Sequence, residues 1–418
     1  MIEILKVGKI GGRVDAPSCK SISQRALLLA AFLAGHKRIG PISGCDDENV
    51  ALSICQSTGM HVVKDGLFYN IYGEPEQPQT LSVGESGTSF RLVLGLLAAK
   101  RWKCRIQWEG RILERPLEPL LEVLRQTGCT LAVEEDHILF DGTHARSMDF
   151  LPIDGSESSQ FVSSIMLYMA MNPHQNKTIR VMGKRISSGY VDITASLLRD
   201  MGIGIRMEND LVEISGTLKE MNMTVNVEGD YSGSAFLMAA GLLLSDEGIL
   251  IGNLNRESLQ PDRNILNILH DHITWKDDLI LCRKKDIKNT LTVDVDTNPD
   301  LAPVIALLGM FSSGGCIIKN SQRLAGKESD RRKAIIDIAE SMGSSVTVDN
   351  DTISIKPGKI SGTPIVPMGK DHRIVMEIIL ALSKISEKFI VSGTEYLSKS
   401  FPNFIDALIE LGFERVRE

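Results

Sequence analysis

Long apolar segments recur along the chain, and each one follows a short polar opening. Apolar residues occupy nearly every position of these segments, a pattern that predicts helices buried on all sides. The openings are rich in Ser, Gly and Asp, which are typical of helix N-termini. The segments read SISQRALLLAAFLAG (21–35), ESGTSFRLVLGLLAA (85–99), SESSQFVSSIMLYMAM (156–171), DYSGSAFLMAAGLLL (230–244), NPDLAPVIALLGMF (298–311) and KDHRIVMEIILALSK (370–384).

The openings are almost evenly spaced, which indicates internal repeats. They lie 66 to 74 residues apart when measured at Ser21, Gly87, Ser158, Ser232, Asp300 and Asp371. Each buried helix is followed by a strand-like stretch, an amphipathic helix and further alternating segments, and most second helices end near Gly. We therefore expect six β-α-β-α-β-β units. The second helices are expected within 46–60, 117–129, 191–203, 263–273, 330–344 and 403–413.

The length of 418 residues exceeds what one hydrophobic core usually serves, so two domains of three units each are expected. A break near 226–233 divides the units equally. The strand-like segment 1–12 precedes the first unit and could pair with the other half of the chain. The fold class is therefore α/β, with mixed strands and helices in both halves.

Composition narrows the function classes. Hydrophobic residues make up 43 % and charged residues 24 % of the chain, which is typical of a globular protein, and no apolar run is long enough to span a bilayer. The net charge of −7 disfavours nucleic acid as a partner. Seven Cys without a C-x-x-C pair and eight scattered His suggest neither a disulfide framework nor a metal site, and fit a reducing cytosol.

Basic residues nevertheless gather at the helix openings and in nearby loops. Because helix N-termini also carry partial positive charge, this pattern favours a site for phosphate or carboxylate ligands. Asp300 and Glu328 place carboxylates beside cations, which makes a general acid–base pair attractive, although an isolated pair of this kind is more often a surface salt bridge. The basic residues are Lys20, Arg25, Arg91, Arg111, Arg115, Lys327, Arg331, Arg332, Arg373 and Lys399.

The chain resembles the 5-enolpyruvylshikimate-3-phosphate (EPSP) synthase family over essentially its whole length. One short motif would be weak support, but nine occur in the family's order. They are PSCKSISQRALLLAA (17–31), ESGTSFR (85–91), EGRILERPLEPL (109–120), DGSESSQF (154–161), ISSGYVDIT (186–194), NPDLAP (298–303), GKESDR (326–331), KDHR (370–373) and SKSFPNF (398–404).

The resemblance implies a two-domain enolpyruvyl-transferase fold with the active site in the cleft between domains. One domain is expected to comprise residues 1–18 and 229–418, and the other residues 19–228. The implied reaction transfers the carboxyvinyl group of phosphoenolpyruvate to the 5-hydroxyl of shikimate 3-phosphate and needs no cofactor. The implied protein is a cytoplasmic monomer that binds small molecules, neither nucleic acid nor membrane, and is a target of glyphosate.

Site residues follow from the matching motifs. The resemblance implies that Asp300 accepts the hydroxyl proton, that Glu328 protonates the methylene carbon, and that Lys20 assists and touches both substrates. The residues implied to bind shikimate 3-phosphate are Lys20, Ser21, Arg25, Ser158, Ser159, Gln160, Ser187, Tyr190, Asp300 and Lys327. Those implied to bind phosphoenolpyruvate are Lys20, Gly87, Arg111, Gln160, Glu328, Arg331, His372, Arg373 and Lys399.

Two alternatives remain open beside this interpretation. A UDP-N-acetylglucosamine enolpyruvyl transferase of the same fold typically has a Cys beside the Arg-Pro pair, and GRILERPLEPL (110–120) has none. A non-catalytic scaffold is favoured only by the departures from the family pattern near Lys20 and Lys327, which are Cys19, Gln24, Arg323, Ala325 and Gly326. Glu85 is a further departure from that pattern.

Overall fold

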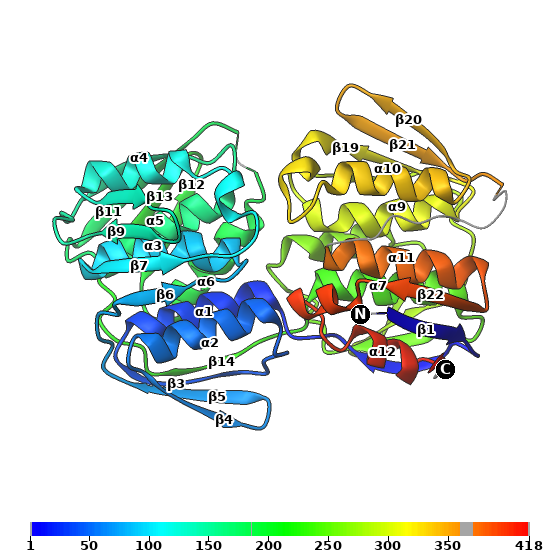
Figure 1. Ribbon diagram of the computed structural model, residues 1–418, viewed down its shortest axis with the longest axis horizontal. Coiled ribbons are helices and arrows are strands. Elements are labelled where there is room, and N and C mark those ends of the chain that lie inside the picture. The colour runs from blue at the N-terminus through cyan, green and yellow to red at the C-terminus, as the bar shows by residue number, and fades with distance from the viewer. Residues whose placement is uncertain (1, 185, 360–370, 417–418) are drawn as a thin grey trace. The chain divides into compact units, whose positions relative to one another are not determined.

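The computed structural model describes residues 2–184, 186–359 and 371–416 (Figure 1). It divides into two compact units. Unit 1 consists of Met1–Pro17 and Glu228–Glu418, and unit 2 of Ser18–Val227. Among the described residues, no helix is both long and apolar enough to cross a membrane.

Unit 2 contains three four-stranded sheets within the described residues, in the orders β14-β3-β5-β4, β6-β7-β9-β8 and β10-β11-β13-β12. Its strands are β3 (Gly35–Gly40), β4 (His61–Asp65), β5 (Phe68–Gly73), β6 (Thr80–Ser82), β7 (Lys103–Gln107), β8 (Thr130–Val133), β9 (Ile138–Asp141), β10 (Phe150–Asp154), β11 (Asn176–Met182), β12 (Gly204–Glu208), β13 (Leu211–Ser215) and β14 (Met223–Asn226). Its helices are α1 (Lys20–Phe32), α2 (Asp46–Ser57), α3 (Gly87–Lys100), the 3-10 helix η1 (Ile112–Glu114), α4 (Glu118–Thr127), α5 (Ser159–Met171) and α6 (Gly189–Asp200).

Unit 1 contains sheets in the orders β16-β17-β15-β2, β18-β19-β21-β20 and β22-β1-β23. Its strands are β1 (Ile2–Val7), β2 (Gly12–Asp15), β15 (Ile249–Gly252), β16 (Ile273–Lys276), β17 (Leu279–Cys282), β18 (Leu291–Asp294), β19 (Cys316–Lys319), β20 (Ser345–Asp349), β21 (Thr352–Lys356), β22 (Lys388–Ser392) and β23 (Phe413–Arg415). Its helices are α7 (Tyr231–Leu244), η2 (Pro261–Asn264), α8 (Ile265–Ile268), η3 (Pro299–Leu301), α9 (Ala302–Met310), η4 (Ser321–Gly326), α10 (Arg331–Ser341), α11 (His372–Ile385), η5 (Thr394–Lys399) and α12 (Phe404–Glu410).

The predicted β-α-β-α-β-β repeat is confirmed, as the segment from β6 to β9 illustrates. β6 pairs in parallel with β7, and β9 pairs antiparallel with both β7 and β8. A parallel pair needs a crossover connection, which α3 supplies. Segment 1–12 pairs as expected, because β1 lies between β22 and β23 near the other end of the chain.

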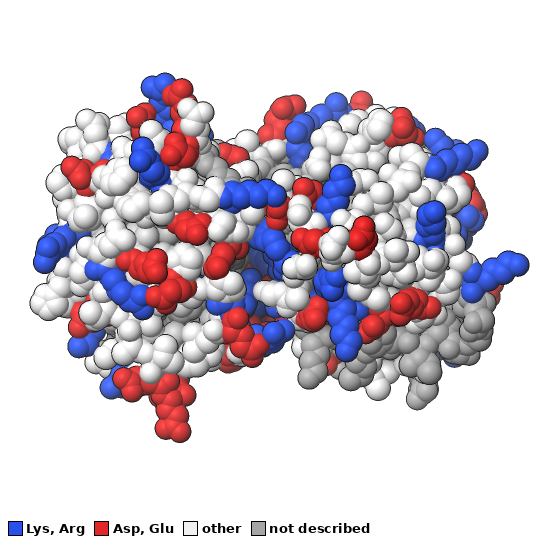
Figure 2. All heavy atoms as spheres, turned by 90° about the horizontal axis from the view of Figure 1, so that it is seen from above, with Lys and Arg blue, Asp and Glu red and all other residues white. Residues whose placement is uncertain are grey.

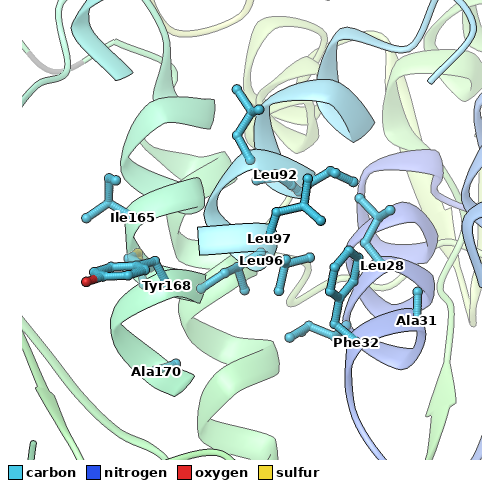
Figure 3. Packing of buried hydrophobic residues seen from close by; sticks show 14 of the residues in the cluster. Leu28, Ala31, Phe32, Leu92, Leu96, Leu97, Ile165, Tyr168 and Ala170 are labelled. Carbon is cyan, nitrogen blue, oxygen red and sulfur yellow. The ribbon is translucent and has the colours of Figure 1, made fainter. Parts of the chain in front are cut away.

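The first helix of each repeat is buried on every side, as its composition predicts. Every described residue of α9 is buried, and α7 is buried from Tyr231 to Leu243. In unit 2, side chains of α1, α3 and α5 pack against one another (Figure 3). Gly95 allows α3 to approach α5 closely, since a Cβ atom there would lie 2.3 Å from the Ser164 carbonyl oxygen.

The prediction of a helix within 263–273 is wrong for most of that range. Only Ile265–Ile268 is α-helical, preceded by the 3-10 turn η2. Asn residues here bond to other side chains, since Asn267 Nδ2 donates to Asn264 Oδ1 and Asn264 Nδ2 donates to Asn298 Oδ1. Asn is a poor helix former, so a segment that contains Asn264 and Asn267 has a low intrinsic preference for a long helix.

Two buried lysines satisfy carbonyl groups at the ends of buried helices. Lys37 and Lys177 are 0 % and 1 % exposed, in the equivalent strands β3 and β11. Lys37 Nζ donates to the carbonyl of Leu33, the C-terminal cap of α1, and to that of Gly35 at 3.0 Å. Lys177 Nζ donates to the Asn172 carbonyl, at the end of α5, at 3.1 Å. An amine therefore supplies donors that water cannot provide in the core.

Lys37→Met is expected to lower the free energy of unfolding of unit 2 by about 1–3 kcal/mol, because the carbonyls lose their donor. Burial lowers the pKa of Lys37 from 10.5 to about 8. The unfolded chain therefore binds more protons between these values, so this group's contribution to stability rises with pH there. Urea unfolding followed by tryptophan fluorescence at pH 7 and pH 10 measures both effects. The exposed Lys64 supplies the control, Lys64→Met, and an equal loss in both variants would contradict the role of Lys37.

Candidate active site

Lys20 opens helix α1 beside a carboxylate of the neighbouring helix α2. Its Nζ lies 3.0 Å from Asp47 Oδ2, and the Asp47 side chain is only 6 % exposed. Sequence analysis predicted Lys20 and missed Asp47. The signal was the acidic start of the second helix, DDEN (46–49), because acidic residues prefer the first turn of a helix but also suit a cationic site.

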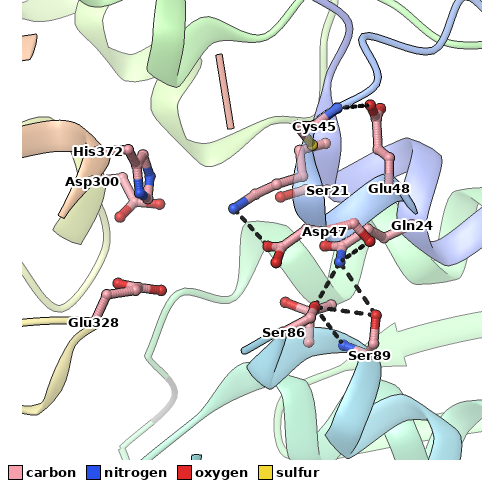
Figure 4. Close-up of polar contacts among 12 residues, drawn as sticks. Ser21, Gln24, Cys45, Asp47, Glu48, Ser86, Ser89, Asp300, Glu328 and His372 are labelled. Atoms are coloured by element: carbon pink, nitrogen blue, oxygen red, sulfur yellow. Dashed lines mark hydrogen bonds and ion pairs between the residues drawn. The ribbon is translucent and has the colours of Figure 1, made fainter. Parts of the chain in front are cut away.

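Polar side chains link the N-termini of α1 and α3 (Figure 4). Gln24 Nε2 donates to the Asp47 carbonyl at 3.2 Å and to Ser86 Oγ at 2.8 Å. Ser86 is the N-cap of α3, and its hydroxyl oxygen accepts a hydrogen bond from the Ser89 backbone N–H. The amide of Gln24 therefore holds the polar start of α1 against the start of α3.

A second link joins α3 to α5. Arg91 Nη1 donates to Gln160 Oε1 at 2.9 Å, and Gln160 Nε2 donates to Thr88 Oγ1 at 2.9 Å. Gly87, the first residue of α3, lies close to the guanidinium groups of Arg91 and Arg115. A Cβ atom on Gly87 would approach Arg115 Nη1 to 2.6 Å and Arg91 Nη1 to 2.9 Å. Glycine at this position therefore leaves room for guanidinium groups over a helix N-terminus.

Arg25 is also buried in this part of unit 2. It is 2 % exposed, and its Nε donates to Thr194 Oγ1 at 2.8 Å while Nη1 donates to the Ser21 carbonyl at 2.7 Å. Its guanidinium carbon lies 6.0 Å from the centre of the Tyr190 ring on α6. Burial lowers the pKa of Arg25 to about 10, against the opposing effects of Tyr190 and Cys19, so the side chain is cationic at neutral pH.

The predicted serines also lie at helix starts. The hydroxyl oxygen of Ser158, the N-cap of α5, accepts a hydrogen bond from the Gln160 backbone N–H. Ser159 is the first residue of the helix and is 5 % exposed. Ser187 is 7 % exposed and has a left-handed φ of 49°, just before α6. Arg111 differs from these residues, because it is exposed and its Nε pairs with Glu114 Oε2 at 2.5 Å.

In unit 1, Arg331 is the centre of a group that we call the carboxylate–arginine cluster: Asp300, Glu328, Arg331, Asp371 and Arg373. Arg331 is 1 % exposed and opens α10. Its nitrogens lie 2.6 Å from Asp300 Oδ1, 2.8 Å from Glu328 Oε2 and 2.7 Å from Asp371 Oδ2. Arg373 Nε lies 3.2 Å from the same oxygen of Asp300. Sequence analysis predicted every member of this cluster except Asp371, the N-cap of α11.

The arginines of the cluster keep Asp300 ionised. Burial opposes the charge of Asp300, but Arg373 and Arg331 outweigh that effect and lower the pKa of this carboxyl well below its ordinary value. Glu328 and Asp300 have side-chain exposures of 25 % and 24 %, so both are accessible, whereas Asp371 is fully buried. Two accessible carboxylates therefore share one buried guanidinium, an arrangement suited to proton transfer.

The remaining predicted residues of unit 1 surround this cluster in different ways. His372, on the first turn of α11, is 2 % exposed, with Nδ1 3.7 Å from Asp371 Oδ1. Lys327 ends η4 and contributes to lowering the pKa of Asp300. Lys399 is 9 % exposed at the end of η5, which packs against α11. Lys370, the first residue of the KDHR motif, lies outside the described residues.

Charge elsewhere on the molecule is mixed. On the face shown in Figure 2, acidic and basic side chains are interspersed. Within the described residues, no group of three or more His, Cys, Asp or Glu side chains is arranged to hold a metal ion. The seven cysteines are all buried thiols in the described part of the chain.

Comparison with known proteins identifies a family. Residues 4–408 match the family model described as EPSP synthase (3-phosphoshikimate 1-carboxyvinyltransferase). A protein of that enzyme name from Picrophilus torridus is 36 % identical over 407 residues, 96 % of each chain, and one from Thermoplasma volcanium is 35 % identical over 409 residues, 97 % of each chain.

Solved structures share the fold at lower identity. An EPSP synthase from Acinetobacter baumannii has a TM-score of 0.80 at 21 % identity and full coverage of both chains. The enolpyruvyl transferase NikO from Streptomyces tendae has a TM-score of 0.77 at 17 % identity, covering 99 % of each chain. The predicted enolpyruvyl-transferase fold is therefore confirmed.

Arg331→Met is expected to destabilise unit 1 by about 3–5 kcal/mol, because Asp300, Glu328 and the buried Asp371 lose the cation they share. Thermal unfolding followed by circular dichroism measures this loss. Lys333→Met removes an exposed cation from the same helix and is expected to change stability little. Equal effects of the two substitutions would show that the cluster is not a structural centre.

Proposed function

The chain belongs to the EPSP synthase family, and we propose that it transfers the carboxyvinyl group of phosphoenolpyruvate to the 5-hydroxyl of shikimate 3-phosphate, releasing phosphate. The whole-chain family match and curated relatives named for this activity support the proposal. The observation that carries it in the structure is the accessible pair Asp300 and Glu328, bound to the buried Arg331. This reaction belongs to the shikimate pathway to chorismate and the aromatic amino acids.

The chemistry requires an acid, a base and several cations. Both substrates carry a phosphate and a carboxylate, so cations must offset their mutual repulsion. The hydroxyl of shikimate 3-phosphate must lose a proton as its oxygen attacks C2 of phosphoenolpyruvate, and C3 must gain one. Elimination of phosphate from the resulting tetrahedral intermediate, with loss of a proton from C3, restores the carbon–carbon double bond.

We assign the proton acceptor to Asp300 and the donor to Glu328. Free Asp300 is a weak base, because Arg331 and Arg373 hold it ionised. Phosphoenolpyruvate bound to these arginines would compete for their positive charge, so Asp300 would become more basic when a base is needed. Arg331, Arg373, His372 and Lys399 are proposed to bind phosphoenolpyruvate, and Lys327 the shikimate moiety.

We propose that residues of unit 2 act on the same two substrates. The backbone N–H groups at the start of α5 suit the phosphate of shikimate 3-phosphate. The residues proposed to hold that substrate are Ser21, Arg25, Ser158, Ser159, Gln160, Ser187 and Tyr190. Gly87 and Arg111 are proposed to bind phosphoenolpyruvate, with Lys20 touching both substrates and assisting proton transfer.

The oligomeric state and the compartment are part of the proposal. We propose a monomer in the cytosol, supported by buried free thiols throughout the described residues. Light scattering coupled to size-exclusion chromatography should give a mass near 45.9 kDa. A mass of twice that value would overturn the monomer.

Phosphate release tests the proposed function directly. Purified protein is mixed with phosphoenolpyruvate and either shikimate 3-phosphate or UDP-N-acetylglucosamine. Release only with shikimate 3-phosphate is the expected result. Release only with the UDP-sugar would assign the chain to the other enolpyruvyl transfer, and a folded protein inactive with both acceptors would favour a binding scaffold.

Asp300→Asn tests the acid–base assignment. Asparagine keeps the volume but cannot accept a proton, so kcat is expected to fall by about 100- to 10,000-fold. Thermal unfolding checks that the variant is folded. Asp294→Asn, a substitution of a partly buried aspartate at the end of β18, serves as the control and should retain activity. Full activity of Asp300→Asn would exclude Asp300 as the base.

A further inference from the structure

A cavity lies at the C-terminal ends of α3 and α5, within unit 2. Its volume is about 290 Å³, close to the lower end of the range for pockets that hold small organic ligands. The last turns of both helices and the loop 142–149 between β9 and β10 supply its walls. The proposed substrate-binding residues Gly87 and Ser159 begin the same helices, and the 14 residues of α3 place its two ends about 20 Å apart. The cavity is therefore separate from the candidate active site.

Two guanidinium groups, those of Arg101 and Arg146, belong to the lining of this cavity. Among the described residues, neither side chain has a hydrogen-bond or ion-pair partner, and no Asp or Glu lines the cavity. Other exposed arginines of unit 2 do have carboxylate partners; Arg206 Nη2, for example, lies 2.5 Å from Glu208 Oε2. Two cations without a carboxylate partner at one cavity favour a negatively charged ligand, which guanidinium groups bind through paired hydrogen bonds.

The backbone of Arg101 adds an independent observation. This residue is the C-terminal cap of α3 and has φ 57° and ψ 40°, in the left-handed region that favours glycine. The corresponding cap of the neighbouring helix α4 is a glycine, Gly128, with φ 98°. An arginine at position 101 therefore carries a backbone cost that glycine would avoid, which indicates a use for its side chain.

The loop that carries Arg146 is held in place by buried side chains at the end of α5. Tyr168, shown in Figure 3, and Asn172 are 2 % and 4 % exposed. The Tyr168 hydroxyl donates to the Arg146 carbonyl, and Asn172 Nδ2 donates to the Met148 carbonyl at 2.7 Å. The Arg146 N–H donates to the Thr127 carbonyl at 2.7 Å. Both polar groups of the Arg146 backbone are therefore fixed, which lowers the entropy lost when its side chain binds a ligand.

We propose that this cavity binds a small organic anion, whose carboxylate or phosphate is held by Arg101 and Arg146. The apolar part of the ligand would contact Ala98, Ala145 and Met171, which also line the cavity. This site goes beyond the proposed function and does not depend on it. The simpler alternative is that the two cations only offset the partial negative charge of the helix C-termini, a role that needs no ligand.

Isothermal titration calorimetry with benzoate and with phenyl phosphate, at constant ionic strength, tests the site. The wild type is expected to bind at least one of them, and which one binds identifies the charged group. Arg101→Gly and Arg146→Met should each weaken binding by about tenfold or more, because each removes charge-assisted hydrogen bonds. Arg206→Met removes an exposed cation elsewhere in unit 2 and should bind like the wild type. No binding of either anion by the wild type, or equal weakening in all three variants, would overturn the proposal.

Two further measurements separate this site from the candidate active site and from a folding defect. In crystals soaked with 4-bromobenzoate or 4-bromophenyl phosphate, the anomalous signal of bromine should lie in the cavity, and bromine found only elsewhere would contradict the proposal. Arg101→Gly should unfold at no lower temperature than the wild type, because glycine suits a φ of 57°. Since neither measurement uses phosphate release, failure of the proposed function would leave the outcome for this site unaffected.

Discussion

A helix buried on every side can present polar groups only at its ends, and this constraint organises both units. α7 and α9 are buried along their lengths, and α1, α3 and α5 pack against one another in the core of unit 2. Their N-termini offer free N–H groups and partial positive charge. Cationic and hydroxyl side chains lie at the starts of α1, α3 and α5, so the apolar packing that stabilises unit 2 also gathers polar groups that we propose bind the substrate anions.

The second organising feature is the sharing of few cations among many carboxylates. Arg331 holds Asp371, which is fully buried, and also Asp300 and Glu328, which are accessible. The buried acid fixes the guanidinium and the accessible acids remain available for chemistry. Under the proposed function, substrate anions would compete for the same cations, so substrate binding and the proton affinity of Asp300 would be coupled in unit 1. The proposed base would then be weakly basic at rest and more basic when substrate is present.

Sequence reasoning succeeds here where a pattern is local or repeated. Six apolar segments with polar openings predict the repeats, and nine motifs place Lys20, Arg25, Asp300 and Arg331 at helix starts. It misses the partners that packing supplies. In the sequence, Asp47 and Asp371 look like ordinary acidic residues at helix N-termini. Only the folded chain brings them close to Lys20 and Arg331. The length of the helix near 265–268 was overestimated for a related reason, since Asn264, which precedes it, bonds to Asn298, a partner distant in sequence.

The pairing of β1 with β22 and β23 has a consequence for synthesis on the ribosome. Unit 2 is one continuous stretch, Ser18–Val227, so all of it is synthesised before most of unit 1. Unit 1 cannot be completed then, because β1 pairs with residues 388–392 and 413–415. At translation rates of about 5–20 residues per second, β1 must wait roughly 20 to 80 seconds for its neighbours. During that interval β1 lacks the strands that cover both of its edges in the folded chain, and an unpaired strand edge can pair with another chain.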